Sequence, residues 1–132
     1  MFIKIILFMA LVSLITATDT MLPGYCLIKG SSIRSSNECF LLSLQGDGNL
    51  VLYRDSDNQA IWSSGTFLTK SSMACIQEDG DFAILDKSGK VLWNAGIRNN
   101  KNSQIILQDD GNLVAYDNSH KALWASNTVT NC

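Results

Sequence analysis

Apolar and polar residues alternate in short runs along most of the chain, and turn-forming residues separate these runs. From residue 49 onward, Leu50 and Leu52 fall on one face of an extended strand, and Asn49, Val51 and Tyr53 fall on the other. Asp-Gly pairs at 47–48, 79–80 and 110–111 precede such runs and favour tight turns between strands. Past the first twenty residues no segment has a sustained helical period, so the pattern predicts an all-β protein.

These strands belong to a repeat. Trp62, Trp93 and Trp124 recur every 31 residues, and each follows a related nonapeptide. The nonapeptides read QGDGNLVLY at 45–53, QEDGDFAIL at 77–85 and QDDGNLVAY at 108–116. Each unit then has a second turn and a short strand that ends at its tryptophan. Residues 26–33 and 38–44 are predicted to form two strands that begin the first unit, and residues 125–132 a last strand, which gives about four strands per unit and twelve in all.

The repeat also predicts where the core lies. A four-stranded sheet of this size cannot bury its apolar face alone, but three such sheets around one axis can bury their inner faces on each other. Leu50, Leu52 and their counterparts would fill this axis together with the three tryptophans. The identical tryptophan position in every unit favours a role in the core. Stacking on sugar rings is the alternative role for these side chains.

The first twenty residues differ from the rest. Lys4 is the only charged residue before Asp19, and an apolar run from Ile5 to Ile15 precedes small residues at 16–18. This pattern is typical of a secretory signal peptide, residues 1–17, which leaves a mature domain of residues 18–132. A membrane anchor is the alternative, but a spanning helix needs about twenty apolar residues. We therefore expect a secreted, extracellular protein without membrane insertion.

Charge and cysteine content narrow the function classes. The formal net charge is -2 and the sequence has no basic patch, so nucleic acid is not an expected partner. The mature chain has an even number of cysteines, which in an exported protein indicates two disulfides. The sequence does not distinguish the three connectivities of Cys26, Cys39, Cys75 and Cys132. Without a Cys-x-x-Cys motif and with His120 as the only histidine, no metal site and no cofactor are expected.

The outer face of the predicted hairpins carries a polar pattern that folding does not explain. An Asp-Gly-Asn turn accounts for Asp47 and Gly48, but it gives no reason for Gln45 or Tyr53. Carboxylate, amide and phenol groups at fixed spacing match the adjacent hydroxyls of a sugar, and valine offers a small apolar wall for the ring. The candidate carbohydrate-binding residues are Gln45, Asp47, Asn49, Val51 and Tyr53, and, in the third unit, Gln108, Asp110, Asn112, Val114 and Tyr116.

The tandem pattern Gln-x-Asp-x-Asn-x-Val-x-Tyr resembles that of the bulb-type (monocot mannose-binding) lectins. The resemblance covers about Leu22 to Thr128. It implies a β-prism II fold, with three four-stranded antiparallel sheets in pseudo-threefold symmetry. It also implies metal-independent binding of terminal α-mannose on glycans by the Gln, Asp, Asn and Tyr of each motif, with the valine packed on the sugar ring. A role in defence fits such a lectin.

The middle unit departs from the pattern. Its positions are Gln77, Asp79, Asp81, Ala83 and Leu85. Asp81 replaces a hydrogen-bond donor with a charge that only accepts, Ala83 loses ring contact, and Leu85 lacks the phenol hydroxyl. Each lost hydrogen bond costs about 0.5–1.5 kcal/mol, which is large for a shallow sugar site. We therefore expect this degenerate site to bind mannose weakly or not at all.

The resemblance also bears on assembly. Members of the family often form homodimers by exchanging the C-terminal strand, whereas the tail of this chain is short and ends in Cys132. We expect Cys132 to bridge to Cys26 and so tie the two termini, with Cys39 paired to Cys75. An intermolecular disulfide through Cys132 is the competing arrangement.

Three other functions are a glycosidase, a calcium-binding protein and a protein-binding domain. A glycosidase needs paired carboxylates, but Asp47 and Asp110 lie in separate repeats without a Glu nearby, and His120 occupies a turn, so no enzyme is expected. Calcium binding at residues 55–58 lacks the Gly and Glu of an EF-hand loop. A β-prism protein that has lost sugar binding and acts through a protein partner remains an alternative.

Overall fold

The computed structural model describes residues 18–132, and the predicted signal peptide lies outside the described residues. This part of the chain is built from strands without any helix, so it holds no helix able to cross a membrane. The strands are β1 (Thr20–Met21), β2 (Cys26–Ile28), β3 (Ser32–Arg34), β4 (Phe40–Leu44), β5 (Leu50–Arg54), β6 (Gln59–Ser63), β7 (Ser71–Ile76), β8 (Phe82–Asp86), β9 (Val91–Asn94), β10 (Gln104–Leu107), β11 (Leu113–Tyr116) and β12 (Ala122–Ala125).

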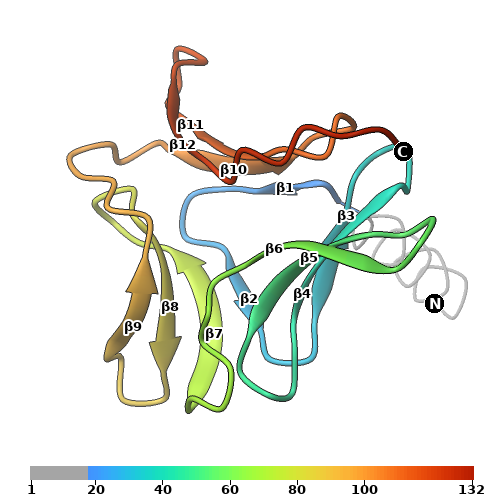
Figure 1. Cartoon of the computed structure of the whole chain (residues 1–132). Coiled ribbons are helices and arrows are strands. Elements are labelled where there is room, and N and C mark those ends of the chain that lie inside the picture. Colours follow the sequence, from blue (N-terminus) through green and yellow to red (C-terminus); the bar gives the residue numbers. More distant parts are fainter. Residues whose placement is uncertain (1–17) are drawn as a thin grey trace, which may run out of the picture.

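The strands form three four-stranded antiparallel sheets around a central axis (Figure 1). Their orders are β3-β4-β5-β6, β2-β7-β8-β9 and β1-β10-β11-β12. Each sheet therefore takes three strands from one repeat and its outermost strand from the N-terminal segment 20–34. This arrangement is the β-prism II fold, and the predicted fold class is confirmed.

Two strand predictions were wrong in detail. Residues 26–33 do not form one strand of the first unit, because Gly30 turns the chain at a φ of +89° and separates β2 from β3. These two strands then join different sheets, β2 on β7 and β3 on β4. The tail after Ala125 forms no strand, because its amides bond to turns instead, as Thr130 N–H does to the carbonyl of Asp110 at 2.9 Å.

The same backbone irregularity recurs in every sheet. Each tryptophan lies opposite an inner residue of the neighbouring strand, in the pairs Leu52–Trp62, Ile84–Trp93 and Ala115–Trp124. One position further along, each strand pair shifts its register through a bulge. The three repeats thus share their backbone geometry as well as their sequence pattern.

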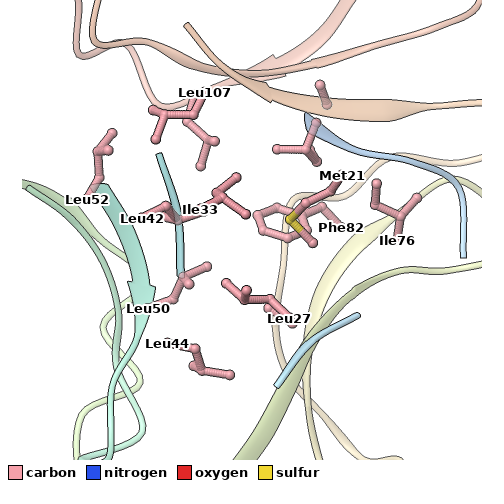
Figure 2. Close-up of a cluster of buried hydrophobic side chains, with 14 of the residues drawn as sticks. Met21, Leu27, Ile33, Leu42, Leu44, Leu50, Leu52, Ile76, Phe82 and Leu107 are labelled. Atoms are coloured by element: carbon pink, nitrogen blue, oxygen red, sulfur yellow. The ribbon is translucent and has the colours of Figure 1, made fainter. Parts of the chain in front are cut away.

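The inner faces of the sheets meet in one core, as predicted. Leu50, Leu52, Phe82 and Ile84 are fully buried, and Figure 2 shows the first three converging with residues of the N-terminal strands such as Met21 and Leu27. The three tryptophans contact one another edge to face, with ring centroids 5.6–5.7 Å apart. Such aromatic pairs add about 0.5–1.5 kcal/mol beyond area burial. The tryptophans are partly buried and pack against the core cluster. Their predicted contribution to the core is thus supported, whereas they do not fill the axis as fully buried residues.

Both disulfides form within the chain, but the expected pairing was wrong. Cys26 bonds to Cys75, its direct neighbour across β2 and β7, with Cα atoms 4.1 Å apart. Cys132 bonds to Cys39, with Cα atoms 5.5 Å apart. Cys26 does not reach the C-terminus because β2 joins the middle sheet beside β7, which places Cys26 opposite Cys75. The intermolecular alternative for Cys132 is also not what the structure has.

Candidate functional site

Each nonapeptide folds into the hairpin that joins two central strands of a sheet. We call the three sets of motif positions site 1 (on β4 and β5), site 2 (on β7 and β8) and site 3 (on β10 and β11). Their turns need glycine, because Gly48, Gly80 and Gly111 have φ values of +92°, +88° and +90°. A Cβ on Gly48 would lie 2.8 Å from the carbonyl oxygen of Thr69, so the turn is also closely packed.

The motif aspartate stabilises the turn in all three sites. Asp47 Oδ1 accepts the N–H of Asn49 at 2.9 Å, and the matching bonds are 3.0 Å at Asp79 and 3.0 Å at Asp110. This is the local side-chain-to-backbone bond that Asp makes two residues ahead in turns. In site 1 the second oxygen, Oδ2, has no protein partner among residues 18–132. The aspartate therefore has a folding role and also an oxygen left for a ligand.

The glutamine and tyrosine of the motif meet across the hairpin. Gln45 Nε2 donates to the Tyr53 hydroxyl at 2.5 Å, whereas the Tyr116 hydroxyl donates to Gln108 Oε1. The Gln108 amide group also donates to both oxygens of Asp110, at 3.0 and 3.2 Å. Two residues that are eight apart in sequence, and that the turn alone did not explain, are thus brought into one polar group in each intact site.

The motif asparagine divides its amide between two tasks. Its Oδ1 holds the loop that follows the tryptophan strand, accepting from Ser64 Oγ and Thr66 N–H at 3.2 Å each. Asn112 repeats this with Ser126 and Thr128 at 3.3 Å each. Neither Nδ2 group has a partner among the described residues. The oxygen serves the fold, and the nitrogen is a donor available to a ligand.

The motif valines lie on the outer face between Asn and Tyr, but they are almost covered. Val51 and Val114 each expose only 3% of their surface. The predicted apolar wall is therefore the floor of each site, with little area of its own for a sugar ring. Ala83 occupies the same position in site 2 and is fully buried.

Site 2 has a different polar core. Asp81 is only 5% exposed, and its Oδ1 accepts the N–H groups of Gly96 and Ile97 at 2.9 Å each. Its Oδ2 accepts from Asn94 Nδ2 at 2.8 Å. The sequence suggested only a lost donor, but Asp81 holds the following loop with Oδ1, as Asn49 does, and bonds to the end of β9 with Oδ2. In the sequence, Ala95 replaces the serine found at Ser64 and Ser126, and its neighbour Asn94 supplies a new amide donor. This exchange was the sequence feature that could have indicated the role of Asp81.

One neighbour of site 3 escaped the sequence analysis. The His120 ring packs edge-on against Tyr116, with centroids 5.4 Å apart, and its backbone has a φ of +63°. The sequence predicted a turn residue at His120, and the structure confirms the turn while adding the contact with Tyr116. Its position four residues after the motif tyrosine, on the turn that follows β11, was the available signal. Site 1 has Asn58 in the corresponding turn, so the two intact sites differ here.

The carboxylates of the acidic loop at residues 55–58 form ion pairs with arginines. Arg54 bonds to both oxygens of Asp57, at 3.0 and 2.7 Å. This contact lowers the pKa of Asp57, mainly through the hydrogen bond, and raises that of Arg54. Asp55 pairs with Arg34 at 3.5 Å. A loop whose carboxylates are neutralised by two guanidinium groups is a poor cation site, and within 18–132 no cluster of three metal-ligating side chains forms.

Comparison with solved structures gives close matches to lectins. A monomeric monocot mannose-binding lectin from Gastrodia elata is 36% identical, with 86% of this chain and 100% of that chain covered and a TM-score of 0.76. The snowdrop (Galanthus nivalis) mannose-specific agglutinin, in complex with methyl-α-D-mannoside, is 30% identical over 86% of this chain and 100% of that chain, with a TM-score of 0.68. A domain-swapped lectin dimer from Mycobacterium smegmatis is 37% identical over 82% and 98%, with a TM-score of 0.51.

Searches against protein-family models and against curated proteins found no match. The sequence identity and coverage of the structural relatives are nevertheless high enough to assign the chain to a family. All three are lectins, which are carbohydrate-binding proteins without catalytic activity, and this chain is accordingly not an enzyme. Its repeat, its three sheets and these relatives together show that the chain belongs to the bulb-type (monocot mannose-binding) lectin family.

Proposed function

We propose that the protein is a secreted lectin that binds terminal α-mannose on glycans through sites 1 and 3, without a metal ion. The observation that carries this proposal is the repeated polar group on two hairpins, in which Gln and Tyr are bonded and the Asn nitrogen has no partner within residues 18–132. Two related proteins named for mannose binding support the choice of sugar. The disulfides suit an oxidising, extracellular setting.

The chemistry of each site assigns the ligand contacts. The aspartate oxygens accept from sugar hydroxyls, and the asparagine nitrogen donates to one. The hydrogen bond between Gln and Tyr fixes the position of both side chains before a ligand binds. The amide and hydroxyl groups can still form further hydrogen bonds with sugar hydroxyls. Charge-assisted bonds to a carboxylate are stronger than neutral ones, so Asp47 and Asp110 should contribute most.

Site 2 lacks these contacts for mannose. Both oxygens of Asp81 are already bonded to Asn94, Gly96 and Ile97, and Leu85 offers no hydroxyl. No amide donor stands at the position of Asn49. We therefore expect two functional mannose sites per chain. Two weak sites on one domain raise the apparent affinity for a multivalent glycan by about 10²–10⁴ when both engage.

A double variant, Asn49→Asp with Asn112→Asp, tests the assignment. Asp81 shows that an aspartate at this position can hold the following loop, so the fold should persist while the amide donor is lost. Titration with methyl-α-mannoside should show at least about a tenfold weaker affinity, equivalent to one charged or well-oriented hydrogen bond. Unchanged binding in a folded variant would refute the proposed sites.

Two controls complete the experiment. Asp81→Asn changes the degenerate site in the reverse direction and should leave the mannose affinity unchanged. Titration of the native protein in EDTA should give the same affinity as without it, since the proposed contacts need no cation. If a glycan array detects no mannose-dependent binding by the native protein, the alternative of a protein partner gains support.

A further inference from the structure

Three lysines from separate segments line one pocket at an end of the middle sheet. Lys29 follows β2, Lys70 precedes β7 and Lys87 follows β8. Figure 1 shows these strand ends gathered at the lower edge of the molecule. The pocket has a volume of about 620 Å³, which is within the range of small-molecule sites. The rest of its lining carries hydroxyl groups, with Asp86 as the single carboxylate.

The positive charge of this pocket is only partly offset by the protein. The ion pairs among residues 18–132 are Arg34–Asp55 and Arg54–Asp57, so none of the three ammonium groups is paired. Asp86 is committed to its own turn, since its Oδ1 accepts from Ser88 N–H, Ser88 Oγ and Lys90 N–H at 2.6–3.0 Å. Three unpaired lysines around a concave surface create a local positive potential on a chain of net charge -2.

The lysines are not a consequence of the repeat. The corresponding turn after β5 carries Asp55 and Asp57, and the turn after β11 has Asn118 where the turn after β8 has Lys87. Asp86 and Lys90 have counterparts in Asp117 and Lys121, so Lys87 is the cation that the middle turn adds. The middle repeat is also the one whose outer residues lack the mannose pattern. The middle sheet thus differs from the other two in a second, independent respect.

We propose that this pocket binds the anionic substituent of a glycan: a phosphate, sulfate or carboxylate group carried on a sugar ring. Lys29, Lys70 and Lys87 supply charge-assisted hydrogen bonds to the anionic oxygens. The Ser72 hydroxyl has no bond to any residue from 18 to 132 and can reach a ring hydroxyl. The pocket contains none of the motif residues of sites 1 and 3, and anion binding there does not depend on their binding mannose. Its residues Thr69 and Ser71 pack against the Gly48 turn of site 1, but the exposed Lys70 side chain makes none of those contacts.

Two variants of equal charge change test the proposal. The first is Lys29→Gln with Lys70→Gln and Lys87→Gln. The control is Arg98→Gln with Lys101→Gln and Lys121→Gln, which removes three exposed cations elsewhere. The probe is galactose 6-sulfate, titrated by NMR, with galactose 6-phosphate, galactose and inorganic sulfate as comparison ligands. The charged sugars should shift the amide signals of residues 29, 70–72 and 86–88 in the native protein.

The pocket variant should bind the charged sugars at least about tenfold more weakly, and the control within about twofold of native, because only the first loses the converging charges. Both variants should keep their affinity for methyl-α-mannoside, which separates this result from the test of sites 1 and 3. Equal losses in both variants, or inorganic sulfate binding as well as the charged sugars, would overturn the proposal. Lysine-dependent binding to phosphatidylserine vesicles without binding to the charged sugars would also overturn it.

Discussion

Asp81 shows how one position in a repeat serves folding and binding in different proportions. In sites 1 and 3 the asparagine oxygen holds the following loop and its nitrogen is left over. In site 2 Oδ1 of Asp81 holds that loop through Gly96 and Ile97, and Oδ2 accepts from Asn94 at the end of β9. The change from Asn to Asp therefore keeps the structural half of the residue's task and gives up the half available to a ligand.

Asp81→Ala should accordingly destabilise the protein although site 2 binds no mannose. The substitution leaves two backbone N–H groups, including the buried one of Ile97, without their acceptor. An unsatisfied buried donor costs about 1–3 kcal/mol, so urea unfolding should show a loss of at least that size. Asp81→Asn, which retains one carbonyl oxygen, should lose less. Equal stability of the alanine variant and the native protein would contradict the structural role.

The Arg54–Asp57 pair predicts a pH dependence of stability. Arg54 lowers the pKa of Asp57 in the folded state, so the pair stabilises the protein above the unfolded-state pKa of that carboxyl group. This contribution is lost as the pH falls through the lower, folded-state pKa. Native protein and Asp57→Asn should therefore differ in melting temperature at neutral pH and converge in acid. Because the pair is exposed, the difference should be small, and curves that stay parallel would contradict the prediction.

At the scale of the hairpin, the turn glycine fixes the shape on which each site is built. The carbonyl of every motif glycine is bound or approached by the loop that follows the tryptophan strand, as Gly48 is by Thr66 Oγ1 and Ser71 Oγ at 2.7 Å each. The hairpin tip, the loop and the motif Asp and Asn therefore form one unit. Loss of the Thr66 or Ser71 hydroxyl would therefore disturb the sugar-facing atoms, whereas the exposed Lys70 side chain takes no part in these bonds.

Gly80→Ala should be more destabilising than a glycine substitution in an open turn. An added Cβ would lie 2.0 Å from the carbonyl oxygen of Asn100, on a backbone with a φ of +88°. Gly46→Ala is the matched control, since nothing lies within 4 Å of its Cβ and its φ is not positive. The left-handed conformation alone costs about 1–2 kcal/mol for a non-glycine residue, and the clash adds to it. Thermal unfolding of both variants measures the difference.

The elements show why sequence predicted some features and missed others. The central strands, the turns and the buried Leu50–Leu52 face follow from local alternation and Asp-Gly pairs, so they could be read directly. The destination of β2 could not, because a three-residue strand carries too little pattern to say which sheet it joins. The predicted partner of Cys26 was wrong as well, because Cys26 lies on β2 and bonds to Cys75 on β7. The motif residues were found by their recurrence, whereas the bonds of Asp81 and the contact of His120 depend on the fold.

At the scale of the molecule, the C-terminal tail ties the third repeat to the first. Cys132 bonds to Cys39, Arg54 donates to Thr130 Oγ1 at 3.0 Å, and Ser56 donates to the Cys132 carbonyl at 3.1 Å. A homodimer that exchanges its last strand would have to give up these contacts, so the oxidised protein should favour a closed monomer.

Removing this tie should change both stability and assembly. A disulfide that closes a loop of this length, 93 residues, contributes about 2–5 kcal/mol, so Cys39→Ser with Cys132→Ser should unfold at lower denaturant. Light scattering should give a monomer mass for the native protein and a larger dimer fraction for the variant. A native protein that runs as a disulfide-linked dimer on a non-reducing gel would contradict the structure.

The N-terminal segment has a consequence for how such a chain can change over time. Residues 20–34 provide one strand to each of the three sheets, so no repeat completes its own sheet. A fourth repeat would have no N-terminal strand with which to complete a four-stranded sheet. Loss of a repeat would leave one of the strands β1, β2 or β3 without a sheet to join. The segment therefore fixes the number of repeats at three. Diversity in this architecture has to arise within the repeats, by altering what each sheet displays, as the middle sheet of this protein does.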